Sequence, residues 1–167
     1  MKPKHYDVLI IGGGPGGISA ASKLVLQGKN VLLINDGPLM GYGIEGAFKS
    51  KAGYELTREY LHVKHREDVF GPLPALNFSR LKNGIEQSAA SLTSMLENRL
   101  QRLKVKLIKG QATFKDPHNI IVGKNEFSGE HIIIATGTRP RILPSMAIDG
   151  KTIITSDEAI DLTNAPR

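Results

Sequence analysis

The chain has 167 residues, enough for one domain with a buried core, and 40% of them are hydrophobic while 23% are charged. No stretch approaches the roughly 20 apolar residues of a membrane span, and no secretory leader is recognisable, so we expect a soluble, cytoplasmic protein without a membrane partner. The net charge is +6, but the basic residues gather at one helix end with few aromatic residues nearby, so we expect no nucleic-acid partner.

The first predicted element is a buried parallel strand that ends in a cluster of glycines. Residues 7–11 form a β-branched and leucine-rich run and residues 16–27 favour a helix, so the glycines fall at a strand-to-helix turn. In the G-x-G-x-x-G pattern, Gly12 makes the tight turn, Gly14 lets the backbone approach a pyrophosphate, and Gly17 lets the helix pack on the strand. The helix N-terminus then presents unpaired N–H groups to the phosphates. The pattern predicts a dinucleotide-binding loop; a glycine-rich turn that binds nothing is the alternative.

A second strand at residues 31–34 completes a βαβ unit of about thirty residues, as this motif requires. An acidic side chain at the end of that strand normally accepts the ribose hydroxyls, but here Asn35 stands in its place and Asp36 follows. An amide oxygen is a weaker acceptor than a carboxylate, so either Asn35 or Asp36 is a candidate for the ribose contact.

The remaining elements follow from periodicity and turn residues. We expect a loop that contains Tyr42 and Glu45, a helix at residues 53–66, a loop at residues 70–78, and then a long amphipathic helix capped by Ser79. Further strands are expected at residues 105–108, 111–115, 119–122, 125–128 and 132–135. This order predicts an α/β fold, a Rossmann-like, three-layer FAD/NAD(P)-binding domain with a small antiparallel β insertion.

Three separated motifs resemble those of the FAD- and pyridine nucleotide-dependent disulfide oxidoreductases, a family that includes dihydrolipoamide dehydrogenase, mercuric reductase and soluble transhydrogenase. Residues 6–17 (YDVLIIGGGPGG) are similar to its FAD-binding start, residues 110–118 (GQATFKDPH) to a hairpin near the adenine, and residues 132–140 (IIIATGTRP) to its second FAD-associated motif. The resemblance implies FAD as cofactor and NAD(P)H as co-substrate of the parent enzyme. It implies FAD contacts at Gly12, Gly14, Pro15, Gly16, Gly17, Asn35, Asp36, Gly41, Tyr42, Lys51, Ala112, Ala135, Thr136 and Gly137.

The chain has no cysteine, although the disulfide reductases of this family carry two redox cysteines in the segment after the second strand. Gly43 and Ala47 stand in their places, and only the following Ser50-Lys51 pair remains. Without a thiolate no nucleophile is available for thiol–disulfide exchange, so we expect an electron acceptor that is not a disulfide. By resemblance, Lys51 lies beside the flavin as a stabilising cation, and an ordinary surface lysine is the alternative. Other catalytic residues are unknown.

Residues 1–149 are expected to form the FAD-binding domain, and residues 150–167 resemble the crossover toward an absent NAD(P)-binding domain. The chain is expected to be either a shortened form of a longer protein or a short chain completed by a partner, inactive alone and able to form homo-oligomers through an incomplete sheet edge.

The expected function is that of the FAD-binding portion of an oxidoreductase, which passes a hydride from NAD(P)H through flavin to a non-disulfide acceptor. Two alternatives remain: a non-catalytic FAD or adenine-nucleotide-binding module, and a single-domain NAD-binding protein. No metal site is expected, because His62 and His65 lack a third ligand.

Overall fold

The structure, a computed structural model, describes residues 3–165. The chain forms two compact units. The first comprises Met1–Gly43 and Thr93–Thr138, and the second comprises Ile44–Leu92 and Arg139–Arg167. The domain boundary expected after residue 149 stays a prediction. Within the described range, no helix combines the length and the apolar character that crossing a membrane requires.

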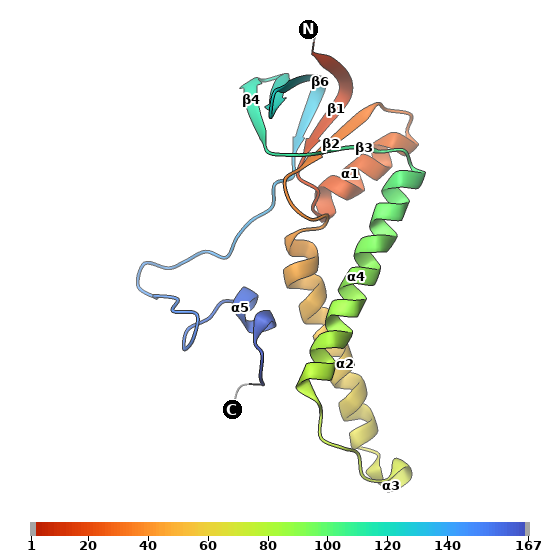
Figure 1. Cartoon of the computed structure of the whole chain (residues 1–167), viewed down its shortest axis with the longest axis vertical. Helices are drawn as coiled ribbons and strands as arrows, with labels where there is room; N and C mark the ends of the chain where they lie inside the picture. The colour runs from red at the N-terminus through yellow and green to blue at the C-terminus, as the bar shows by residue number, and fades with distance from the viewer. Residues whose placement is uncertain (1–2, 166–167) are drawn as a thin grey trace. The chain divides into compact units, whose positions relative to one another are not determined.

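A six-stranded sheet with strand order β3-β2-β1-β6-β5-β4 forms the centre of the first unit (Figure 1). Its strands are β1 (Lys4–Ile11), β2 (Val31–Asn35), β3 (Lys106–Lys109), β4 (Ala112–Asp116), β5 (Asn119–Val122) and β6 (Asn125–Ile134). The pairs β1–β2, β1–β6 and β2–β3 are parallel, whereas β4–β5 and β5–β6 are antiparallel. This arrangement confirms the predicted α/β, Rossmann-like fold with an antiparallel insertion.

Two apolar clusters cover the two faces of the central strands. Because side chains alternate along a strand, successive residues of β2 belong to different clusters. Val31 and Leu33 lie in one cluster, and Leu32 and Ile34 lie in the other. The first cluster packs against helix α1 (Pro15–Leu26) and against Leu100 of helix α4 (Phe78–Arg102). The second cluster includes Ile120 of β5, so the antiparallel strands cover the opposite face and the unit has three layers.

Strand β6 is continuous, whereas the sequence predicted two separate strands at residues 125–128 and 132–135. Parallel pairing with β1 carries it through Gly129, which the sequence placed between the two strands. Antiparallel pairing with β5 involves only its first four residues. Among the residues that the structure describes, no strand pairs with the other edge of residues 130–134, and Ile134 is 65% exposed.

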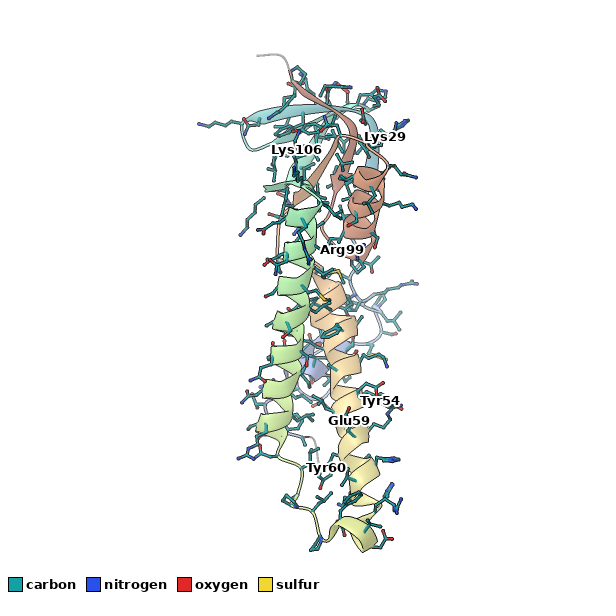
Figure 2. The ribbon with its side chains drawn as sticks, turned by 90° about the vertical axis from the view of Figure 1, so that its right-hand side faces the viewer. Lys29, Tyr54, Glu59, Tyr60, Arg99 and Lys106 are labelled. Atoms are coloured by element: carbon teal, nitrogen blue, oxygen red, sulfur yellow. The ribbon has the colours of Figure 1, made fainter. Side chains whose placement is uncertain are left out.

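Two antiparallel helices, α2 (Lys49–Lys64) and the first part of α4, pack together in the second unit. Figure 2 shows them side by side. Gly53 faces Ile85, and Gly84 faces Leu56, so small residues alternate with large ones across the contact. A Cβ built on Gly53 would lie only 3.1 Å from Cδ1 of Ile85. The two glycines therefore allow the helices to approach closely.

Helical structure begins earlier in this segment than the sequence predicted. The π-helical turn η1 (Gly43–Phe48) contains Glu45, for which a loop was expected, and it leads directly into α2, which begins before the predicted start at residue 53. The long helix also has a different cap: Oδ1 of Asn77 accepts the N–H of Arg80 at 3.0 Å, so Asn77 rather than Ser79 caps α4. The cap was misplaced because both residue types are common caps, and only the observed hydrogen bond distinguishes them.

Two short helices complete the second unit: α3 (Glu67–Phe70) and α5 (Ser156–Asp161). A capping box begins α5. The Thr155 hydroxyl accepts the N–H of Asp157 at 3.2 Å, and the Glu158 carboxylate accepts the N–H of Thr155 at 2.6 Å. Hydrogen bonds from the hydroxyl and then the N–H of Thr155 hold the pKa of the Glu158 carboxyl below its ordinary value.

Candidate functional site

The carboxyl ends of β1, β2 and β6 meet at one place in the first unit. The N–H of Gly12 donates to the carbonyl of Ile34 at 2.8 Å, and the N–H of Ala135 donates to the carbonyl of Ile11 at 2.7 Å. The strand order reverses here, because β1 connects through α1 to β2 on one side while β6 lies on the other side. In open parallel sheets, ligands bind in the crevice at such a reversal.

Packing requires three of the loop glycines. Gly12 has a φ of +109°, and a Cβ built on it would overlap the carbonyl oxygen of Ala135. A Cβ on Gly17 would overlap the carbonyl oxygen of Gly12, and one on Gly13 would lie 2.7 Å from Cγ of Asn35. These contacts match the turn and packing roles that the pattern predicts for Gly12 and Gly17.

The other two glycines of the loop, Gly14 and Gly16, face open space. No described atom outside the loop lies within 4 Å of a Cβ built on either of them. Gly14 is the N-cap of α1, and Pro15 occupies the start of the helix. Within the described residues, no side chain caps this helix, and its first turn contains no acidic side chain. The N–H groups of the first turn and the positive end of the helix dipole are therefore presented to that space, which favours an anion.

Asn35 joins the glycine loop to the loop after β2. Its Oδ1 accepts the N–H of Gly13 at 2.8 Å. Its Nδ2 donates to the carbonyls of Gly37 at 2.6 Å and Pro38 at 3.2 Å. The carbonyl of Gly13 in turn accepts the N–H of Met40 at 2.6 Å, so both polar groups of this buried glycine are satisfied. The amide of Asn35 thus supports the loop, a role that the sequence did not indicate.

Asp36 lies beside Asn35 at the end of β2 and is exposed. Across residues 3–165 its carboxylate makes no hydrogen bond or ion pair. The amide of Asn35, by contrast, is engaged through both its oxygen and its nitrogen. Of the two ribose acceptors that the sequence left open, Asp36 is the one whose acceptor atoms are all available.

Four more of the predicted FAD-binding residues lie in the loops that begin where β6 and β2 end. Thr136 and Gly137 are exposed directly after β6, whose last residue pairs with the last residue of β1. Gly41 and Tyr42 are half-buried in the loop that begins after β2. The structure therefore gathers these residues and the glycine loop at one end of the sheet.

Ala112 lies further along the chain, at the start of β4 on the edge of the sheet. The N–H of Gly110, two residues earlier, donates to the backbone carbonyl of Asn35 at 2.9 Å. The chain thus passes the end of β2 before it reaches β4. The side chain of Ala112 packs against the second apolar cluster, so only its backbone remains for the expected adenine contact.

Lys51 belongs to the second unit and lies on the exposed side of α2. Its Nζ is 2.7 Å from Oε1 of Glu55 and 5.8 Å from the centre of the Tyr54 ring, and its side chain is 69% exposed. The ion pair with Glu55 spans one helical turn. The role beside the flavin that the resemblance implies for Lys51 stays a prediction.

The buried lysine of this segment is Lys49, which the sequence analysis did not single out. Its Nζ lies 2.6 Å from Oε2 of Glu45 and 2.9 Å from Oε1 of Glu86. Burial alone would lower the pKa of Lys49, but the hydrogen bonds and charges of the two glutamates outweigh burial, and the pKa is raised. The spacing of four residues between Glu45 and Lys49 is the signal that could have identified it.

Within residues 3–165, no three His, Cys, Asp or Glu side chains are grouped so that they could hold a metal ion. His62 and His65 are exposed at the end of α2. The site at the strand ends therefore consists of backbone N–H groups, one free carboxylate and polar loop residues, a set suited to a nucleotide.

Known proteins that are similar to the chain include two dehydrogenases and one transhydrogenase. The chain is 30% identical to dihydrolipoyl dehydrogenase of Bacillus subtilis (strain 168), covering 94% of this chain and 36% of that protein. It is 36% identical to dihydrolipoamide dehydrogenase of Chaetomium thermophilum, covering 96% of this chain and 34% of that protein. It is 32% identical to soluble pyridine nucleotide transhydrogenase of Mycobacterium tuberculosis (strain ATCC 25177 / H37Ra), covering 98% of this chain and 37% of that protein.

The chain thus spans about a third of the length of these relatives. The sequence pattern of one family, pyridine nucleotide-disulphide oxidoreductase, matches residues 6–167. This match includes the glycine loop, the antiparallel strands and the segment after β6. The chain belongs to the pyridine nucleotide-disulphide oxidoreductase family.

Proposed function

We propose that the first unit binds FAD and is the FAD-binding portion of an oxidoreductase that passes a hydride from NAD(P)H through flavin to a non-disulfide acceptor. The observation that carries this proposal is the open space at Gly14 and Gly16 in front of the uncapped start of α1. The N–H groups of that turn bind the diphosphate, and the carboxylate of Asp36 accepts the ribose hydroxyls. Membership of an oxidoreductase family supports the same assignment.

When bound, FAD supplies the ring that accepts and releases the electrons of a hydride. The residues of the chain bind and orient it. Asn35 fixes the glycine loop through Gly13, which keeps the N–H groups of α1 directed at the diphosphate. Lys51 belongs to the second unit, where its pair with Glu55 restricts its orientation, and its role as a flavin-adjacent cation rests on the resemblance alone.

The acceptor that we propose follows from the composition. The chain has no cysteine, so it supplies no thiolate for exchange with a disulfide. A quinone or a second nicotinamide nucleotide needs no such thiolate. One relative is named a soluble pyridine nucleotide transhydrogenase, and that name supports an acceptor of the nucleotide class.

We also propose that a further strand completes the sheet, supplied by a longer form of the protein or by a second chain. The free edge of β6 at residues 130–134 and the exposed Ile134 support this proposal. If two copies of the chain pair through this edge, Ile134→Lys should convert a dimer to a monomer in light scattering. An unchanged dimer mass would contradict pairing at this edge.

FAD binding is tested by the visible absorption spectrum of the purified chain and by calorimetric titration with FAD. We expect a yellow protein, or a saturable complex when FAD is added. Gly14→Val should abolish binding without lowering the melting temperature, because the new side chain fills the space in front of the loop. Ala90→Val, at an exposed position of α4, is the control and should leave the affinity unchanged. An affinity of Gly14→Val within a few-fold of the parent would contradict the loop assignment.

The second candidate is a non-catalytic module that binds FAD or another adenine nucleotide. The match to only about a third of each relative supports it. Binding of FAD without oxidation of NADH or NADPH by the 167-residue chain would favour this module, and turnover would exclude it. A protein that stays colourless in excess FAD but melts at a higher temperature with NAD would instead be a single-domain NAD-binding protein.

A further inference from the structure

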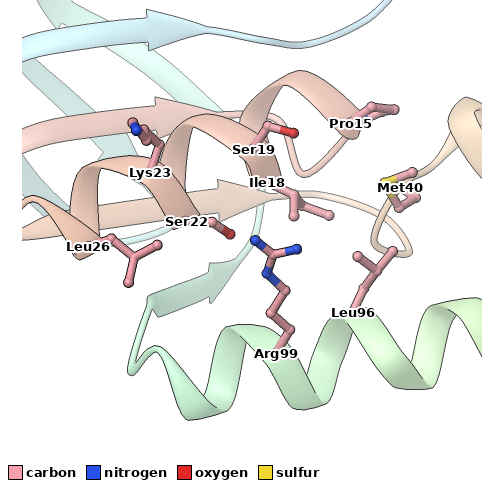
Figure 3. A pocket seen from close by; sticks show the side chains of 9 residues that line it. All are labelled: Pro15, Ile18, Ser19, Ser22, Lys23, Leu26, Met40, Leu96 and Arg99. Atoms are coloured by element: carbon pink, nitrogen blue, oxygen red, sulfur yellow. The ribbon is translucent and has the colours of Figure 1, made fainter.

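A pocket of about 270 Å³ lies in the first unit, between α1 and the C-terminal part of α4 (Figure 3). Ile18 and Leu26 of α1 and Leu96 of α4 form apolar walls. The polar residues at the pocket are Ser19, Ser22 and Lys23 of α1 and Arg99 of α4. The pocket runs along the side of α1 from Pro15 to Leu26, and its polar groups are side chains rather than the N–H groups of the first turn.

Ser22 is the first observation that indicates a ligand. The residue is only 4% exposed, and its Oγ has no hydrogen-bond partner among the residues that the structure describes. A buried hydroxyl without a partner is rare in folded proteins, because desolvation is then uncompensated. In Figure 3, this hydroxyl points into the space between the helices.

Arg99 is the second observation. Its guanidinium points from α4 toward α1, in the direction of Ile18 and Ser22 (Figure 3). Across residues 3–165 it makes no ion pair and no hydrogen bond. Arg102, one turn further along the same helix, differs because its Nε donates to the carbonyl of Asn98 at 3.3 Å. Arg99 is exposed, and its guanidinium donors are thus available to a ligand at the pocket.

The position of Lys23 decides how many positive charges face the interior of the pocket. Its ammonium points away from Arg99 in Figure 3, so it lies at the rim rather than inside. One cation therefore faces the interior, and the opposing walls at Ile18, Leu26 and Leu96 are apolar. A single negative charge attached to an apolar group matches this set of residues, whereas a strongly hydrated dianion such as phosphate does not.

We propose that this pocket binds a small carboxylate that carries a short apolar chain. The carboxylate accepts two N–H groups from Arg99 and the hydroxyl of Ser22, and the chain packs between Ile18, Leu26 and Leu96. A volume of about 270 Å³ falls just below the range of sites for drug-sized ligands, which limits the ligand to a small molecule. The pocket borders the glycine loop at Pro15, but the groups that hold the carboxylate lie outside that loop, and the proposal does not rest on FAD binding.

The test is calorimetric titration of the full chain with sodium hexanoate. We expect one saturable site with a Kd on the order of 1 mM, as a ligand of this size allows. Arg99→Gln should weaken binding on the order of tenfold, because it removes the charge and keeps most of the stem. Ser22→Ala should weaken binding several-fold without lowering the melting temperature, since it removes only an unpartnered hydroxyl.

Arg102→Gln is the matched control, because it removes a charge from the same helix outside the pocket, and it should leave the affinity for hexanoate unchanged. Gly14→Val should also retain hexanoate binding, which separates this site from the proposed FAD site. Equal weakening by Arg99→Gln and Arg102→Gln would overturn the proposal. So would tighter binding of hexanol or inorganic phosphate than of hexanoate, or the absence of a saturable site.

Discussion

The ammonium of Lys49 in α2 lies 2.9 Å from the carboxylate of Glu86 in α4. This ion pair connects the two antiparallel helices of the second unit at a position where the lysine side chain is only 8% exposed. Glu45, one turn earlier than Lys49, supplies a second carboxylate to the same ammonium. Two carboxylates thus replace the water that a buried ammonium loses.

Glu86→Gln should therefore destabilise the protein. The expected loss is about 1 kcal/mol, because Lys49 keeps Glu45 and the Glu86 side chain is 53% exposed, where solvent already screens part of the attraction. Urea unfolding followed by circular dichroism of the helices measures this change. Glu97→Gln, at an exposed position of α4, should leave the unfolding midpoint in place. An equal shift in both variants would show that the pair contributes nothing specific.

The raised pKa of Lys49 predicts a loss of stability at alkaline pH. A lysine whose pKa is higher in the folded state contributes stability below its ordinary value of 10.5, and this contribution disappears as the pH rises through the raised pKa. Burial also raises the pKa of Tyr6 above its ordinary value, and both the parent and the Lys49→Met variant contain this tyrosine. The stability of the parent minus that of Lys49→Met should therefore be constant up to about pH 10 and become smaller above it. A difference that does not change with pH would contradict this assignment.

Asn35→Ala should lower stability by about 1–3 kcal/mol, because it leaves the buried N–H of Gly13 without its acceptor. Asn35→Asp keeps an acceptor for Gly13 but directs a carboxylate oxygen at the carbonyls of Gly37 and Pro38, so it should also lower stability. Asp36→Ala is the control: it should keep the melting temperature and weaken FAD binding. If Asn35→Ala instead leaves the melting temperature unchanged and removes FAD binding, Asn35 is a ribose ligand rather than a support of the loop.

Gly17→Ala and Gly16→Ala form a matched pair one residue apart. Gly17→Ala should destabilise the first unit by about 3 kcal/mol or more, because the new methyl group overlaps the carbonyl oxygen of Gly12. Gly16→Ala should be tolerated, since its methyl group enters open space. Thermal melting and amide NMR spectra of the two variants give the comparison. Similar melting temperatures would rule out the close contact between helix and loop.

The capping box of α5 predicts that the start of this helix becomes less stable at acidic pH. Hydrogen bonds from Thr155 lower the pKa of Glu158 below 4.5, so the stability of this helix start is present above pH 4.5 and is lost as the pH falls through the lowered pKa. An NMR titration should show the midpoint of Glu158 below 4.5. Thr155→Val should move this midpoint upward, whereas Thr155→Ser should keep it low. The same titration midpoint of Glu158 in the parent, Thr155→Val and Thr155→Ser would contradict the capping arrangement.

The central sheet could be predicted from the sequence because its strands are buried on both faces. The apolar runs at residues 7–11 and 31–34 are typical of strands that a parallel sheet buries on both faces. The strands β1 and β2 contain these two runs. Residues 79–103 repeat leucines at helical spacing, and α4 covers nearly the same range. Local pattern and tertiary structure agree in these elements.

The supports of the candidate site could not be predicted in the same way. Asn35 occupies the position of an expected ligand, and only the fold brings its amide to Gly13, 22 residues earlier. Lys49 and Lys51 are two residues apart and equally basic, so composition does not distinguish them. The helical geometry that begins at Gly43 turns one toward Glu86 and leaves the other in solvent. Contacts between distant segments decide these roles.

The pairing of β1 with β6 has a consequence for how the chain folds during synthesis. His5 and Ser128, which are hydrogen-bonded across this pair, are separated by 123 residues. β1 is made first, yet one of its edges stays without a partner until the ribosome has added nearly the whole first unit and all of α2 and α4. Contacts of such long range slow folding and leave apolar strands open to wrong partners. We therefore expect nascent chains that stop before β6 to depend on chaperones, and rapid acquisition of protease resistance only once Ile134 has left the ribosome.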